Sequence, residues 1–150
     1  MLKDKYEKLQ LKNQLSFPIY LCSKEVIRKY TPYLDKLDLT YTQYIVMMYF
    51  WEKNESNVKE LGNTLLLDSS TLTPLLKKLE NKGYIERKRS SKDERNLVIR
   101  LTHAGEKLRD KALNIPEEMN KCINLDSNEV ATLYSLIYKV LINIEKDHNN

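Results

Sequence analysis

One stretch of the sequence decides the fold, and it reads DSSTLTPLLKKLENKG over residues 68–83 and YIERKR over residues 84–89. Leucines recur in the first part with the spacing of a helix, whereas the second part has the alternation of a strand. Asp68 is a good N-cap, because its carboxylate can accept hydrogen bonds from the free N–H groups of a first helical turn. Gly83 stands where a helix commonly ends in a left-handed residue. The stretch therefore predicts a capped helix over 69–81 that is followed directly by a strand.

The segments next to this stretch complete a small module. A short amphipathic helix is predicted at Val58–Leu65, joined to the capped helix by a short turn. On the other side, Leu97–Leu101 has the pattern of a second strand, and the polar residues 90–96 predict a hairpin between the two strands. Helix, short turn, capped helix and basic hairpin, in that order, are typical of a winged helix-turn-helix. We therefore predict a mainly α fold with a small β-hairpin wing, and a winged helix-turn-helix over 58–101.

The N-terminal third is predicted to be helical. Apolar residues recur there at helical spacing, and Pro18 is comfortable only in a first turn, so the helix either starts near Ser16 or kinks there. Pro32 marks its predicted end. A second helix is predicted over 42–52, and its apolar run is suited to burial on most sides.

The C-terminal third predicts further helices. Thr102 caps a helix over 104–113, and Pro116 interrupts or restarts it. Asp126 and Glu129 form a capping-box pattern that opens a last helix with a wide apolar stripe. Packing on its own domain is one interpretation of this stripe, but apolar helices at both chain ends are what a helical dimer interface needs, and we favour the dimer. The stripe consists of Val130, Leu133, Leu136, Ile137, Val140, Leu141 and Ile144.

Composition and cysteine content limit the class of protein. A chain of 150 residues is long enough for one domain with a core, and its net charge of +4 permits a polyanionic partner without demanding one. The two cysteines lie far apart in the sequence, which excludes a disulfide framework and suits a reducing cytoplasm. The N-terminus has no apolar signal-peptide core, and the most apolar stretch, 44–51, is too short to cross a bilayer. We expect a cytoplasmic protein with no membrane partner.

Positive charge is concentrated in the predicted module. From Asp68 to Arg100 there are nine Lys or Arg against five Asp or Glu, an excess equal to that of the whole chain. Capping chemistry and a solvated hairpin edge would each explain part of this pattern, but their coincidence in one module indicates double-stranded DNA as the partner. The side chains predicted to reach base edges or phosphates are Asp68, Ser69, Ser70, Thr71, Thr73, Lys77 and Lys78 on the helix and Arg87, Lys88 and Arg89 on the hairpin.

Several motifs resemble those of one family. The runs LDSSTLTPLLKKLE (67–80), RKRSSKDER (87–95) and LTHAG (101–105) resemble the multiple-antibiotic-resistance regulator (MarR) family. The runs NQLSF (13–17) and LTYTQY (39–44) are similar to its branch of organic-hydroperoxide-sensing (OhrR-type) repressors. The resemblance covers almost the entire chain, and it is most specific in the capped helix and the hairpin.

The resemblance implies how such a protein binds DNA. It implies a homodimer whose two capped helices, the recognition helices, enter successive major grooves of a pseudo-palindromic operator. It also implies that Arg95, oriented by Asp93, reaches into the minor groove from the wing. We therefore expect one domain over 1–150, with a helical dimerisation region at 1–35 and 104–150 and a winged-helix DNA-binding region at 36–103.

The chain departs from the resemblance at the sensor. OhrR-type repressors carry a reactive cysteine in an NQLCF motif, and this chain has Ser16 at that position. A serine hydroxyl is not ionised near neutral pH and cannot form a sulfenic acid, so no peroxide sensing is expected by that route. In the family, tyrosines from the second subunit line the thiol pocket, and the matching residues here are Tyr20, Tyr30 and Tyr41.

Two interpretations of Ser16 stay open. It is either an engineered replacement that traps a reduced-like state, or a natural residue in a regulator with another trigger; the retained tyrosines favour the first. Cys122 lies near the place where two-cysteine members of the branch carry a resolving thiol. Cys22 is about 240° around the helix from Ser16, and we interpret it as a small buried apolar residue.

Other function classes are less well supported. No arrangement of nucleophile and base can be inferred around the two histidines, so we do not expect an enzyme. Cys22, His103 and Cys122 show no metal-ligand spacing, so no metal and no cofactor is predicted. The alternative that remains is a MarR-like repressor that responds to a ligand or a metal without a sensing thiol.

Overall fold

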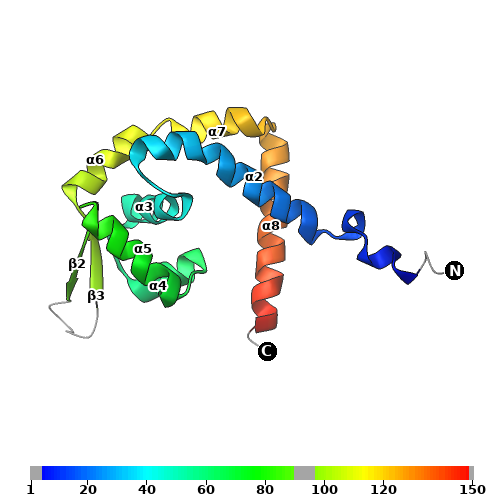
Figure 1. Ribbon diagram of the computed structural model, residues 1–150, viewed down its shortest axis with the longest axis horizontal. Coiled ribbons are helices and arrows are strands. Elements are labelled where there is room, and N and C mark those ends of the chain that lie inside the picture. Colours follow the sequence, from blue (N-terminus) through cyan, green and yellow to red (C-terminus); the bar gives the residue numbers. More distant parts are fainter. Residues whose placement is uncertain (1–4, 90–96, 149–150) are drawn as a thin grey trace. The chain divides into compact units, whose positions relative to one another are not determined.

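The structure is a computed structural model that describes residues 5–89 and 97–148. By its internal contacts the chain divides into two compact units, Met1–Ile115 and Pro116–Asn150. The first unit holds the sheet and most of the buried residues, and the second holds most of α7 and all of α8 (Figure 1).

The first unit begins with helical turns and one long helix. Two 3₁₀ turns, η1 (Glu7–Leu9) and η2 (Leu11–Asn13), precede α2 (Ser16–Leu34), so the predicted start at Ser16 is confirmed. The predicted end at Pro32 is wrong, because the helix continues through this proline to Leu34. A proline in the last turn removes one hydrogen bond but leaves little helix after it to break. The chain then forms η3 (Asp35–Leu37) and turns at Asp38, which has a positive φ of 51°.

Helix α3 (Tyr41–Lys53) lies at the centre of the first unit. Thr40 caps it in a capping box with Gln43, whose N–H donates to the Thr40 hydroxyl at 3.3 Å and whose side-chain oxygen accepts from the Thr40 N–H at 3.1 Å. The helix starts one residue earlier than predicted, and its burial on most sides is confirmed. Its buried residues are Gln43, Tyr44, Val46, Met47, Phe50 and Trp51.

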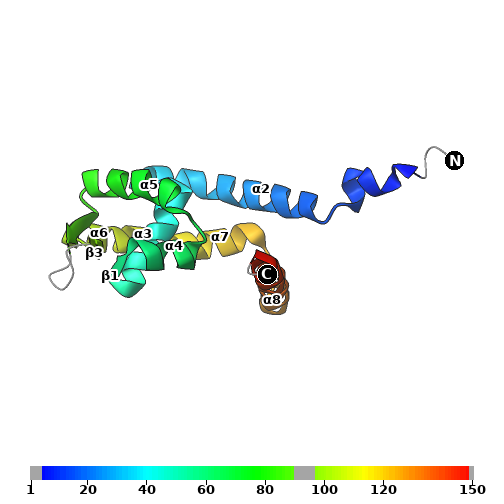
Figure 2. The ribbon, with the colours of Figure 1, turned by 90° about the horizontal axis from the view of Figure 1, so that it is seen from below.

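The predicted winged helix-turn-helix is present. Helices α4 (Val58–Leu65) and α5 (Ser69–Asn81) are followed by strands β2 (Ile85–Arg89) and β3 (Leu97–Leu101). A third strand, β1 (Glu55–Asn57), was not predicted; it pairs antiparallel with β3, and the sheet has the order β1-β3-β2. Helix α4 packs against both α5 and β1, and Figure 2 shows these elements of the module from a second side.

Helix α6 (His103–Ala112) closes the first unit against α3. Its cap is Thr102, as predicted, and the Thr102 hydroxyl accepts from the Gly105 N–H at 3.1 Å. The indole N–H of Trp51 donates to the Gly105 carbonyl at 2.8 Å. A Cβ on Gly105 would lie 2.1 Å from the carbonyl oxygen of Tyr84, so only glycine allows this close approach.

The remaining helices are α7 (Ile115–Ile123) and α8 (Ser127–His148). The predicted capping box of α8 is confirmed, since Asp126 accepts from the Glu129 N–H and the Glu129 side chain accepts from the Asp126 N–H, both at 2.9 Å. None of the helices in the described ranges combines the length and the apolar character needed to span a membrane.

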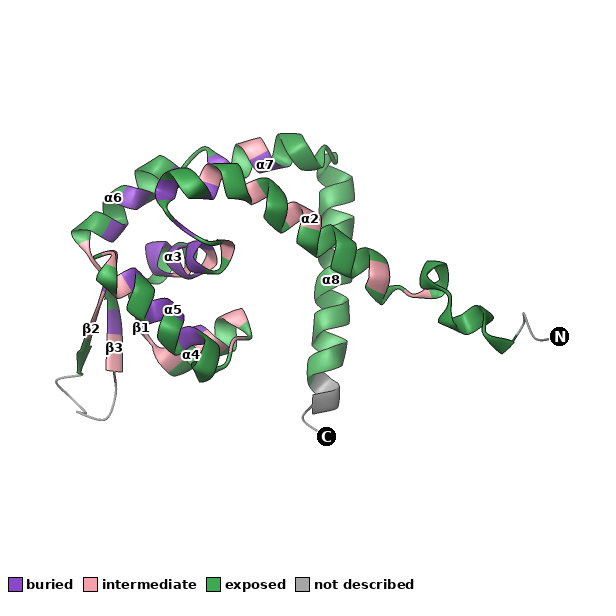
Figure 3. Ribbon diagram, viewed as in Figure 1, coloured by how far each residue is buried: buried purple, intermediate pink, exposed green. Residues whose placement is uncertain are grey.

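Burial differs sharply between the helices. Figure 3 shows buried positions along α3, α5 and α6, whereas α8 is coloured as exposed over its described side chains. The side chains described in α8, through Glu145, include no buried one. They nevertheless include ten large apolar residues with at least 37% of their surface exposed: Val130, Leu133, Tyr134, Leu136, Ile137, Tyr138, Val140, Leu141, Ile142 and Ile144.

Candidate nucleic-acid interface and sensor region

Asp68 fixes the N-terminus of α5. Its carboxylate accepts from the N–H of Thr71 at 2.8 Å and from the hydroxyl of Ser70 at 2.6 Å. These hydrogen bonds, that of the Ser70 hydroxyl first, hold the pKa of Asp68 below its usual value. The carboxylate therefore has a structural task at the helix start, because an acceptor-only group bonded to the first turn stabilises the positive end of the helix.

The two faces of α5 have opposite character. The apolar side chains that it buries are Leu72, Leu75, Leu76 and Leu79. The residues of α5 and its cap that the sequence predicted to contact DNA are all exposed: Asp68, Ser69, Ser70, Thr71, Thr73, Lys77 and Lys78. The helix thus presents a row of hydroxyls and ammonium groups to the outside while its leucines hold it in the unit.

Some of these hydroxyls also bond within the helix. The hydroxyl of Thr73 donates to the carbonyl of Ser69 at 2.7 Å, and that of Ser70 donates to Asp68. Each keeps lone pairs that can accept a hydrogen bond from a base amine, but its proton is already used. Ser69 has no side-chain hydrogen bond within the part of the chain that the structure describes, so its hydroxyl can both donate and accept.

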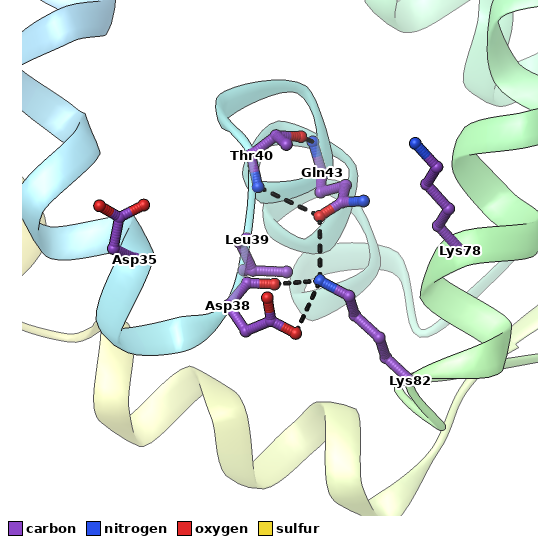
Figure 4. A pocket seen from close by; sticks show the side chains of 7 residues that line it. All are labelled: Asp35, Asp38, Leu39, Thr40, Gln43, Lys78 and Lys82. Atoms are coloured by element: carbon purple, nitrogen blue, oxygen red, sulfur yellow. Dashed lines mark hydrogen bonds and ion pairs between the residues drawn. The ribbon is translucent and has the colours of Figure 1, made fainter.

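Lys82 connects the C-terminal end of α5 to the junction between α2 and α3. Its ammonium lies 3.0 Å from the Asp38 carboxylate and 3.5 Å from the side-chain oxygen of Gln43, and it also donates to the Asp38 carbonyl. Figure 4 shows these contacts at a pocket of about 320 Å³, which Lys78 and Asp35 also line. Sequence reasoning missed this connection, because residues 38 and 82 carry no local signal that brings them together.

The hairpin strands carry the second group of predicted DNA contacts. Lys88 and Arg89 are exposed, and the Lys88 ammonium lies 2.8 Å from Glu86. Arg87 differs, because its guanidinium is bonded to Glu80 at the end of α5. Asp93 and Arg95, predicted for the wing tip, lie outside the described residues.

The predicted sensor tyrosines divide into two groups. Tyr30 on α2 and Tyr41 on α3 have ring centroids 4.9 Å apart, and the ring of Tyr44 is 5.9 Å from that of Tyr30. Burial raises the pKa of all three hydroxyls, in Tyr44 to about 12. Tyr20 is 60% exposed. Tyr44 belongs to the cluster but was not among the predicted sensor residues, because its position in an apolar run is equally typical of a core residue.

Ser16 is not next to the tyrosine cluster in one chain. It is exposed at the first position of α2, and Tyr30 follows fourteen positions later, about 21 Å along the helix axis. Cys22 is exposed, so its interpretation as a buried apolar residue is wrong for the single chain. Cys122 is exposed as well, and both cysteines are free thiols. Within the described ranges, no three His, Cys, Asp or Glu side chains are grouped to hold a metal ion.

Comparison with known proteins gives concordant matches. The family model described as transcriptional regulator SarA/Rot matches residues 28–112. The organic hydroperoxide resistance transcriptional regulator of Bacillus subtilis is 41% identical over 140 residues, which are 93% of this chain and 95% of that protein.

Two solved structures extend the comparison to nearly the full chain. Reduced AbfR bound to DNA, a protein of Staphylococcus epidermidis, has a TM-score of 0.77 and 32% identity, and the match covers 93% of this chain and 98% of that one. A cysteine-to-serine mutant of MarR from E. coli, in complex with operator DNA, has a TM-score of 0.74 and 31% identity, with coverage of 85% and 93%. The chain belongs to the SarA/Rot family of MarR-type transcriptional regulators, and it is a regulator rather than an enzyme.

Proposed function

We propose that this protein is a cytoplasmic repressor that binds a pseudo-palindromic operator in double-stranded DNA as a homodimer. The exposed polar face of α5 carries this proposal, because six Ser, Thr and Lys side chains face outward from a helix that four buried leucines hold in place. AbfR and MarR, which share the fold over most of their length, have structures in complex with DNA.

The side chains of the module divide by what they can contact. Ser69 and Thr71, in the first turn of α5, are assigned to base edges in the major groove. Lys77, Lys78, Lys88 and Arg89 are assigned to phosphates, since each is an exposed cation on α5 or β2. Arg95, with Asp93 to orient it, is proposed to enter the minor groove.

The dimer is proposed to form through residues 1–35 and 104–150, with residues 36–103 contacting DNA. The exposed apolar residues of α8 support this assignment, because a single chain leaves them in water. The first turns of α2 add exposed Ile19, Tyr20 and Leu21. A second copy of the chain supplies the same apolar residues in return, as a two-fold symmetric interface requires.

The sensor is proposed to be silent in this chain because position 16 lacks a thiol. In one chain Ser16 and the Tyr30–Tyr41 pair lie far apart, so a pocket that contains both must combine two copies. With a cysteine at position 16, the thiolate would attack the O–O bond of an organic hydroperoxide, giving a sulfenic acid and an alcohol. A second thiol, for which we propose Cys122, would then displace water and form a disulfide.

A paired binding assay tests the function and its control together. We expect the protein to remain on inverted-repeat operator DNA when an organic hydroperoxide is added, and Ser16→Cys to release it. Ser23→Cys is the matched control, because Ser23 is also exposed on α2 but lies away from position 16; it should not release. Release by the unaltered protein, or by Ser23→Cys equally, would contradict the sensor assignment. If the unaltered protein, before any hydroperoxide is added, bound no inverted repeat, the proposal that it is a repressor would be refuted.

A ligand-responsive repressor is the second candidate. A pocket of about 240 Å³ between α2 and α3 favours it, with Ile27, Leu34 and Tyr41 among its lining residues. This volume is below that of a typical drug-sized ligand site, so the pocket would hold only a smaller molecule. Operator release by such a molecule without any thiol at position 16 would favour this candidate over the redox one.

A further inference from the structure

Glu80 and Arg87 form the most connected ion pair of the described part of the module. Arg87 lies in the middle of β2, and Glu80 is the penultimate residue of α5. The Arg87 Nε donates to Glu80 Oε2 at 2.8 Å, and Nη2 donates to the same oxygen. The backbone N–H of Arg87 donates to the other oxygen, Oε1, at 3.2 Å. One carboxylate therefore binds both the side chain and the main chain of one wing residue.

The backbone hydrogen bond has a topological cause. In the order β1-β3-β2, strand β2 is an edge strand, and Arg87 is paired with Ile99 of β3 on one side only. Its N–H points to the open edge, where no strand among the described residues supplies an acceptor. Glu80 supplies that acceptor from α5, so the end of the recognition helix is joined directly to the edge of the wing.

The pair is also better protected from solvent than the Arg100–Glu55 ion pair of the same sheet. The side chains of Arg87 and Glu80 are 25% and 31% exposed. Those of Arg100 and Glu55 are 53% and 56% exposed. Lower exposure weakens screening by water and salt. In agreement, the hydrogen bond from the Arg87 side chain lowers the pKa of Glu80.

The segment between the two residues is short and tightly turned. The N–H of Gly83 donates to the Glu80 carbonyl at 2.8 Å, and that of Tyr84 donates to the Leu79 carbonyl at 3.1 Å. Gly83 has a φ of 76°, which places the turn in the left-handed region. The Glu80–Arg87 pair therefore spans the short turn that sets the direction of β2 relative to α5.

We propose that Glu80 and Arg87 are positioning residues that fix the wing relative to the recognition helix, and that Arg87 is not a phosphate ligand. This inference rests on the proposed DNA-binding function. A protein that contacts the major groove with α5 and the minor groove with the wing must hold α5 and the wing at one fixed angle before it binds the duplex. A preorganised angle saves the ordering cost on binding. The guanidinium of Arg87 is bonded to the Glu80 carboxylate, and this bond fixes the angle between α5 and the wing.

A measurement on the free protein tests the pair without DNA. Amide hydrogen exchange at Arg87 should be slow in the unaltered protein and at least about tenfold faster in Glu80→Ala, because the acceptor of that N–H is lost. Lys88→Ala is the matched control on the same strand, and it should leave exchange at Arg87 unchanged. Equal exchange at Arg87 in the unaltered protein and Glu80→Ala would overturn the structural half of the proposal.

Operator binding over a salt series tests the functional half. Glu80→Ala removes a negative charge, so simple electrostatics predicts tighter binding, whereas the positioning role predicts binding weaker by about tenfold. Arg87→Lys keeps the charge and should weaken binding similarly, with the salt slope unchanged. Lys88→Ala, which removes a proposed phosphate contact, should lower that slope by about one.

The outcomes separate the two proposals. Arg87→Gln removes the positive charge, and its salt slope should equal that of the unaltered protein if Arg87 contacts no phosphate. Tighter binding by Glu80→Ala, or a salt slope that falls in Arg87→Gln as it does in Lys88→Ala, would show that Arg87 contacts phosphate and overturn the positioning role. If the exchange result holds but the unaltered protein binds no inverted repeat, the proposed function fails while the tie between helix and wing stands.

Discussion

Helices α5 and α8 both carry apolar faces, but the leucines of α5 are buried within its unit, whereas the large apolar side chains described in α8 are exposed. Leu72, Leu76 and Leu79 of α5 are at most 1% exposed. In α8, Ile137 is 47% exposed and Leu136 is 55% exposed. Both helices have an aspartate N-cap that accepts from a first-turn N–H. The sequence thus marks the start of both helices by the same kind of cap. The helices differ in what covers their apolar side chains: residues of its own unit cover those of α5, and a second surface is needed for those of α8.

The comparison separates two kinds of stability. The recognition helix is held by contacts that exist in one chain, so its geometry is fixed before any partner arrives. The apolar face of α8 gains nothing from burial until a second surface covers it, and each covered square ångström is worth about 25 cal/mol. We therefore expect changes on α8 to act through assembly, and changes on α5 to act through the fold of the unit.

The largest effect is expected from a charge on the α8 stripe. Ile137→Glu would place a carboxylate in the proposed dimer interface, where burial without a partner is costly. We expect a monomer in sedimentation experiments and operator affinity reduced by more than about 100-fold, because a monomer offers one recognition helix instead of two. Ser135→Glu adds the same charge at an exposed polar position on the opposite side of α8 from Ile137, and it is the matched control. A dimeric Ile137→Glu variant with normal affinity would break the comparison at α8.

A cavity under α5 is expected to have the next largest effect. Leu79 is fully buried, so Leu79→Ala should lower the free energy of unfolding by about 2–5 kcal/mol through lost apolar contact and an unfilled space. Chemical denaturation measures this loss, with the dimer concentration held constant. Leu113→Ala removes the same atoms from a residue that is 74% exposed, and it should change stability little. Equal losses in the two variants would contradict the burial of the α5 face.

Local signals in the sequence were sufficient for the module. Helix α5 begins after Asp68 and ends before Gly83, as predicted, because caps and left-handed turns depend on the residue and its immediate neighbours. Strand β1 was missed, because its residues Glu55–Asn57 are polar and few, and they become a strand only by pairing with β3 about forty residues later. Pro32 was wrongly predicted to end the helix, because a proline in the last turn removes one hydrogen bond and leaves only two helical residues after it.

The site was only partly predictable for the same reason. The exposed side chains of α5 follow from its period and were placed as expected. The Glu80–Arg87 and Asp38–Lys82 connections depend on which charged residues meet after folding, and charged residues are too common in the sequence to single these out. Exposure of Cys22 depends on packing around α2, which its helical spacing alone did not reveal.

The smallest effect is expected from the caps that the two helices share. The lowered pKa of Asp68 means that its ionised form is favoured in the folded protein. Its contribution to stability is therefore fully present above the unfolded value of about 3.9, and it is lost as the pH falls through the lower pKa of the folded state. Asp68→Asn should keep the cap at neutral pH but lose this acid dependence, and Asp68→Ala should lose both, which thermal unfolding over a pH series measures.

Asp126→Ala is the counterpart on α8, because it removes a cap of the same type. The comparison of the two helices predicts that Asp68→Ala weakens operator binding slightly by fraying the turn that carries Ser69 and Thr71, while Asp126→Ala leaves the affinity of the assembled dimer unchanged. If both substitutions lowered affinity equally at dimer-saturating concentration, the first turn of α5 would have no special part in contacting DNA. The proposed difference between α5, which contacts DNA, and α8, which forms the dimer interface, would then rest only on the burial of their apolar side chains.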